Sequence, residues 1–235
     1  MNELRFEVEI ARGDAVPVEV VRERAYGAVR VRAEWPEDLA TPEIRVAVVV
    51  EGDVDRRDAP AYVELFFHDV FLLLNLATPA SFGGTVAITG GELRVRELSF
   101  SPRLFAYAQG LERVPLEAVV AWYDRVRLGT RQVAEDGPAT ALFQLLHLAR
   151  GEETEEVSIL RLASAAEAVV HERAPLRRLF ALRDQIARGR APVFHPMHDD
   201  ALDPSVEDAT REWIEVADAA ASTVIAALQN TARGA

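Results

Sequence analysis

The stretch DAPAYVELFFHDVFLLLNLATP, residues 58–79, decides how the first half of this 235-residue chain folds. Asp58 is a favourable N-cap residue, and Pro60 suits the first turn of a helix. Thr78 and Pro79 end the segment, because proline disfavours helical backbone in the residue before it. Apolar residues between these signals recur at helical spacing: Tyr62, Phe66, Val70, Leu73 and Ala77. The pattern predicts one helix of about five turns.

Segments with the period of a β-strand lie on both sides of this helix. Residues 4–10 and 29–35 alternate between apolar and polar, which predicts half-buried strands, while residues 44–50 are more uniformly apolar. Residues 85–88 and 93–100 flank a Gly-Gly pair, which predicts a hairpin. The apolar phase slips between Val95 and Leu98, which indicates a bulge. We therefore expect residues 1–110 to form an antiparallel or mixed sheet with one packed helix.

Residues 111–235 have a helical period throughout. Proline, glycine and acidic residues mark the ends of five predicted helices, at residues 115–129, 138–151, 154–171, 175–188 and 203–228. Short connections between helices with apolar stripes predict an antiparallel bundle. The fold class is therefore α+β, with no flexible linker between the two parts.

Composition excludes several classes of site. The chain contains no cysteine, and all 26 of its basic residues are arginine, so disulfides, thiolate metal sites and Schiff-base chemistry are excluded. A net charge of −12 opposes general binding to nucleic acids. Asp69 and Asn75 interrupt the most apolar stretch, which is too short to span a bilayer. Without a signal-peptide pattern at the N-terminus, we expect a cytoplasmic protein that does not bind membranes.

The segment LFALRDQIARGR, residues 179–190, carries the residues with the clearest chemical interest. Leu179, Leu182 and Ile186 form an apolar stripe, and Arg183 lies beside it. A charged side chain at the edge of a core needs a partner. We therefore predict a salt bridge from Arg183 to Glu167 on the preceding helix.

The same segment and the sequence ILRLASAAEAVV, residues 159–170, resemble the HEPN superfamily, especially its ApeA-like branch. The resemblance covers residues 116–228 and no part of the first 110 residues. It implies a HEPN-like helical bundle that pairs as a homodimer, with RNA as a partner. In active members of the family, two Arg-polar-His motifs face each other and cleave RNA without a metal.

The resemblance assigns the catalytic site to Arg183, Asp184, Arg188 and His195. Arg183 and Asp184 match the first two positions of the motif, but Arg188 occupies the place of the histidine. Arginine cannot transfer protons near neutral pH, so the general acid and base of the family is missing there. His195 could replace it, because it follows Arg190 with four residues between and Arg188 with six.

These residues leave three hypotheses open. The first is a non-catalytic interaction or sensor module that dimerises through its helical half. The second is a metal-independent ribonuclease of the toxin or defence type, which uses Arg183 and His195. The third is a metal-dependent hydrolase built on the loop HPMHDD, residues 195–200, although that loop is better explained as a polar surface loop. We expect no enzyme activity, no cofactor and no bound metal.

Charge is unevenly distributed around the motif. Residues 172–190 contain six arginines and two acidic residues, whereas residues 199–218 contain eight acidic residues and one arginine. The basic stretch could face RNA. We expect instead that neighbouring helices neutralise each other, within one chain or across a dimer.

Overall fold

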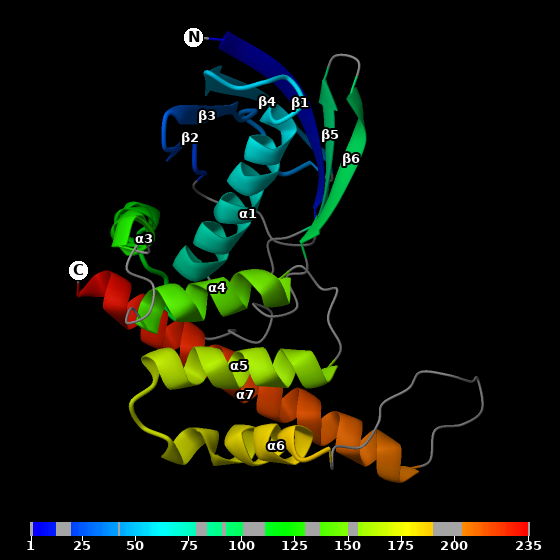
Figure 1. Ribbon diagram of the computed structural model, residues 1–235, viewed down its shortest axis with the longest axis vertical. Helices are drawn as coiled ribbons and strands as arrows, with labels where there is room; N and C mark the ends of the chain where they lie inside the picture. The colour runs from blue at the N-terminus through cyan, green and yellow to red at the C-terminus, as the bar shows by residue number, and fades with distance from the viewer. Residues whose placement is uncertain are drawn as a thin grey trace.

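A computed structural model describes residues 2–12, 20–41, 43–78, 84–90, 93–100, 111–129, 137–149, 155–189 and 204–234. Within these residues, a six-stranded antiparallel sheet is followed by a set of packed helices (Figure 1). The predicted α+β fold is therefore confirmed.

The sheet has the strand order β2-β3-β4-β1-β5-β6. Its strands are β1 (Asn2–Arg12), β2 (Glu23–Tyr26), β3 (Val29–Glu34), β4 (Glu43–Gly52), β5 (Gly84–Gly90) and β6 (Leu93–Phe100). Five of the six were predicted, and β2 was missed. The β5–β6 hairpin has one register irregularity, between Ile88 and Gly90, which pair with Arg96 and Leu93. It lies closer to the turn than the predicted slip between Val95 and Leu98.

Helix α1 (Ala59–Ala77) is the predicted helix: it begins after Asp58, whose side chain makes no capping hydrogen bond, and Pro60 lies in its first turn. Every residue from Phe66 to Ala77 is buried, because α1 is covered by strands and by other helices. Among the described helices, α1 is the one whose length and composition would allow it to cross a membrane. The protein itself buries most of that apolar surface, as in the core helix of a soluble protein.

The remaining helices form the second part of the molecule. They are α3 (Leu116–Gly129), α4 (Gly137–Ala149), α5 (Glu155–Val169), the 3₁₀ turn η2 (Ala174–Leu176), α6 (Arg177–Ala187) and α7 (Pro204–Arg233). In Figure 1, α4, α5 and α6 lie in a row, and α7 crosses behind them. Helix α5 packs against all three of α4, α6 and α7. All five predicted helices of this part are present.

One hydrophobic core runs through both parts of the molecule. It contains buried residues of the sheet, of α1 and of the later helices. At the end of α1, the buried side chain of Gln229 on α7 donates hydrogen bonds to the carbonyl oxygens of Leu76, at 2.7 Å, and Glu112, at 3.3 Å. The backbone N–H of Val114 donates to the carbonyl oxygen of Ala77 at 2.8 Å. The described residues of the two parts therefore share one continuous core.

Candidate functional site

Arg183 lies on α6 and binds two carboxylates. Its Nη1 donates to Oε1 of Glu167 on α5 at 2.6 Å, which confirms the predicted salt bridge. Its Nε and Nη2 donate to Oδ1 of Asp184 at 3.2 Å and 3.0 Å. The bonds to Glu167 and Asp184 raise the pKa of Arg183 above its ordinary value. The guanidinium of Arg183 therefore connects the neighbouring helices α5 and α6.

An aromatic ring and a second arginine complete this cluster. The guanidinium carbon of Arg183 lies 5.1 Å from the centre of the Phe180 ring, and that of Arg173 lies 5.5 Å from the same ring. Nη2 of Arg173 also lies 3.8 Å from Oε1 of Glu167. Both arginines are therefore held by the same ring and the same carboxylate, through cation–π and ionic contacts.

The two remaining members of the predicted site are Arg188 and His195. In the described part of the chain, no histidine is hydrogen-bonded to Arg183. Arg188 follows the end of α6 and is exposed, with no carboxylate partner among the described residues. His195 lies outside the described residues, as does the whole stretch from 195 to 200. The described residues also contain no group of three His, Asp or Glu side chains that could hold a metal ion.

Among the described residues, the expected neutralisation between the basic stretch 172–190 and the acidic stretch 199–218 is present at one pair. Nη2 of Arg178 on α6 donates to Oε1 of Glu212 on α7 at 3.0 Å. Three of the arginines in residues 172–190 are thus paired with acidic side chains: Arg173, Arg178 and Arg183. This pairing weakens the interpretation of the stretch as a bare basic surface.

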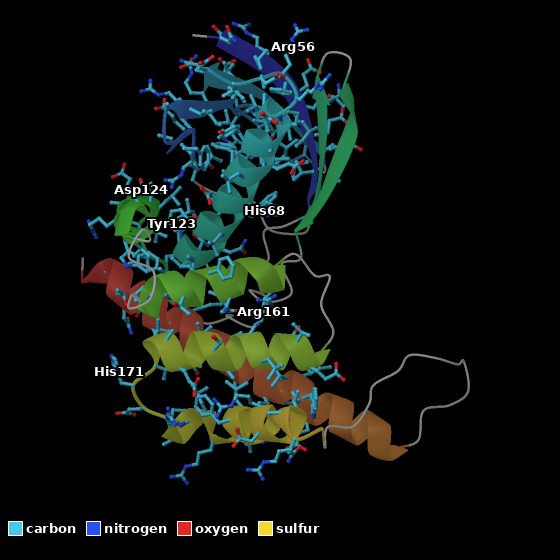
Figure 2. All side chains as sticks on the ribbon, viewed as in Figure 1. Arg56, His68, Tyr123, Asp124, Arg161 and His171 are labelled. Atoms are coloured by element: carbon cyan, nitrogen blue, oxygen red, sulfur yellow. The ribbon has the colours of Figure 1, made fainter. Side chains whose placement is uncertain are left out.

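A second polar cluster, which sequence reasoning missed, lies where the sheet, α1 and α3 meet. Asp69 of α1 has only 1% of its side chain exposed. It accepts hydrogen bonds from the hydroxyl of Tyr26 on β2, at 3.0 Å, and from the hydroxyl of Tyr123 on α3, at 2.6 Å. Figure 2 shows Tyr123 on α3, beside α1.

Arg24 of β2 provides the positive charge of this cluster. Its side chain is 3% exposed, and its Nε lies 3.6 Å from Oδ2 of Asp69. Its Nη2 lies 2.6 Å from Oδ1 of Asp124 on α3, and its guanidinium carbon lies 5.1 Å from the centre of the Tyr123 ring. We call Arg24, Tyr26, Asp69, Tyr123 and Asp124 the junction network.

The electrostatics of the junction network follow from its burial. Burial lowers the pKa of Arg24, but the hydrogen bond to Asp124 and the charges of Asp69 and Asp124 more than offset that effect and raise the pKa. Arg24 therefore stays charged at every working pH, as buried arginine does when carboxylates surround it. Two acidic groups share one cation, and one of them, Asp124, keeps 48% of its side chain in solvent.

One signal in the sequence could have located the junction network. Asp69 interrupts a long run of apolar residues, which predicts a buried helix. A carboxylate in such a helix is buried as well and requires partners. His68, beside it, is also buried, with 8% of its surface exposed. The partners of Asp69 could not be read from the sequence, because Tyr26 and Tyr123 are 43 and 54 residues away.

With this geometry in place, the chain was compared with known proteins. No family model, no curated protein and no solved structure matches it.

Proposed function

We propose that this chain is a non-catalytic interaction or sensor module with a HEPN-like helical half, acting in the cytoplasm. The observation that carries the proposal is the position of Arg183. In the ribonucleases that the motif resembles, this arginine would be needed to stabilise phosphate charge. Here its guanidinium is bound to Glu167 and Asp184 and stacked on Phe180.

A phosphate group would have to compete with both carboxylates for Arg183. Any anion that approaches also meets the negative charges of Glu167 and Asp184, which raises the electrostatic cost of binding. Arg188 cannot supply the missing proton transfer, because arginine is a poor general acid or base near neutral pH. These properties support a structural role for Arg183 rather than a catalytic one.

The continuous core supports the sensor part of the proposal. The sheet and the later helices share α1, and the junction network connects all three. A ligand or partner on the sheet could therefore influence the helices without a flexible hinge. For the homodimer, two large apolar side chains of adjacent helices support a contact surface: Phe143 of α4 is 58% exposed and Leu160 of α5 is 38% exposed.

The test is RNA cleavage by the purified full-length chain. A panel of structured and single-stranded RNAs is incubated with the wild type, with Arg183→Ala and with Arg178→Ala as a matched arginine control on the same helix. We expect no cleavage above a heat-inactivated sample for any of the three. Cleavage by the wild type that is lost in Arg183→Ala and kept in Arg178→Ala would overturn the proposal in favour of the ribonuclease.

Should cleavage be found, a metal chelator decides between the two catalytic hypotheses, because His195 takes part in both. Cleavage by the wild type that a metal chelator does not affect, and that is lost in His195→Ala, supports the metal-independent ribonuclease. Loss of activity on chelation supports the metal-dependent hydrolase. The dimer is tested separately, by light scattering of the wild type and of Phe143→Glu, for which we expect a shift from dimer to monomer.

A further inference from the structure

The junction network has a property that neither the motif nor the fold class predicts. Strand β2 is a four-residue strand at the edge of the sheet, and its one strand neighbour is β3. Its exposed residues are Glu23 and Ala25, and its inward residues are Arg24 and Tyr26. Both inward residues carry polar groups, and the junction network joins β2 to α1 beside the ring contact between Tyr26 and Tyr62.

Helix α3 reaches the same carboxylate from the other side. Tyr123 donates to one oxygen of Asp69, Oδ1, while Tyr26 donates to the other, Oδ2. Arg24 extends the connection, because its guanidinium lies near Oδ2 of Asp69 and binds Asp124 of α3. Strand β2 and helix α3 thus share one buried anion and one buried cation.

From these contacts we infer that β2 and α3 are energetically coupled through Asp69 and Arg24, so that loosening either element loosens the other. The physical reason is that the charges of Asp69 and Arg24 are almost wholly removed from water. When one donor leaves Asp69, the remaining donors must compensate a charge that solvent does not reach. The position of the remaining donors then becomes less well defined, and so does the element that carries them.

Through this coupling, a change at the edge strand β2 affects the helical half. A partner that pairs with or displaces β2 alters the contacts of α3, which packs on α1, α4 and α7. By thermodynamic linkage, a partner that displaces α3 must alter β2 to the same degree. The coupling is a property of the fold and holds whether or not the chain cleaves RNA or dimerises.

Reciprocal tyrosine substitutions in the full chain test this inference. Tyr26→Phe removes a hydroxyl from β2, and Tyr123→Phe removes one from α3, while each ring stays in place. Native-state hydrogen exchange is then followed for amides of β2 and α3, with α5 as the internal reference. We expect each substitution to raise exchange about tenfold in its own element and about fivefold in the other, with α5 unchanged.

The matched control is Tyr62→Phe. Tyr62 lies on α1 with its ring centre 6.2 Å from that of Tyr26, and its hydroxyl makes no hydrogen bond within the described part of the chain. We expect this variant to exchange like the wild type in both elements.

The inference is overturned if Tyr26→Phe changes β2 alone and Tyr123→Phe changes α3 alone. It is also overturned if Tyr62→Phe gives the same changes, because the effect would then not depend on Asp69. If Tyr123→Phe fails to fold, Asp124→Asn provides the second variant, since it weakens the bond from Arg24 at the solvent-exposed end. Its expected effect is about fivefold faster exchange in β2, and unchanged β2 exchange contradicts the coupling.

Discussion

Arg24 and Arg183 each bind two carboxylates and each lie against an aromatic ring, but their surroundings differ. The side chain of Arg24 is 3% exposed, and its contacts join β2, α1 and α3. The side chain of Arg183 is 29% exposed, and its contacts join α5 and α6. Water can replace the partners of Arg183, whereas it does not reach most of the partners of Arg24. Similar contacts should therefore contribute more to the free energy of unfolding at Arg24 than at Arg183.

The largest expected effect is that of Arg24→Met. This change removes the cation of the junction network from the buried Asp69, and breaking a buried ion pair costs about 3–5 kcal/mol. We expect the free energy of unfolding, measured by urea denaturation followed by circular dichroism, to fall by that amount. The control is Arg45→Met, which removes an exposed ion pair with Glu9 and should cost less than about 0.5 kcal/mol. Equal losses in the two variants would contradict the comparison.

A smaller effect is expected when both charges of the buried pair are removed. In the double variant Arg24→Met, Asp69→Leu, no buried carboxylate remains uncompensated. Replacing a buried ion pair by apolar residues is often close to neutral, so the double variant should be more stable than Arg24→Met alone by about 1–2 kcal/mol. If the stability lost in the double variant equals the sum of the losses in Arg24→Met and in Asp69→Leu, the two residues do not interact energetically.

A still smaller effect is expected for Arg183→Met. Its ionic contacts are open to solvent, so the loss in free energy of unfolding should be about 0.5–1 kcal/mol. Arg188→Met is the matched control. Arg188 directly follows α6, the helix of Arg183, and has no carboxylate partner among the described residues. A loss of about 3 kcal/mol in Arg183→Met would show that its cluster is as tightly built as the junction network.

The smallest effect concerns salt. At 1 M NaCl the screening length falls to about 3 Å, which weakens exposed ion pairs more than buried ones. The stability difference between wild type and Arg183→Met should therefore shrink by about 0.3 kcal/mol between low and high salt. The difference between wild type and Arg24→Met should stay constant in the same denaturation series. An equal change in both differences would mean that solvent ions reach the junction network.

The sequence predicted the parts of this molecule that depend on local order. Pro60 and the apolar repeat located α1, and the predicted bond between Glu167 and Arg183 needed only that two consecutive helices lie side by side. Strand β2 was missed because it is four residues long and its inward residues, Arg24 and Tyr26, are polar. It pairs with the adjacent strand β3, but its contacts with Asp69 and α3 join residues that are distant in the sequence.

The same reason limited the prediction of candidate sites. A motif draws attention to residues that are close in sequence, such as Arg183 and Asp184. The junction network has no motif, because each of its three elements contributes one or two residues. Its one local signal was an aspartate in an apolar helix, which predicts a buried partner but does not say where that partner lies.

The shared position of α1 has a consequence for how this protein can be divided. A fragment that ends before α3 keeps α1 but loses the helices that cover part of it, and would present phenylalanine and leucine side chains to water. A fragment that begins at α3 lacks the helix against which α3 and α7 pack. Each piece therefore loses part of the packing around α1. Expression trials should therefore keep α1 together with both the sheet and the later helices.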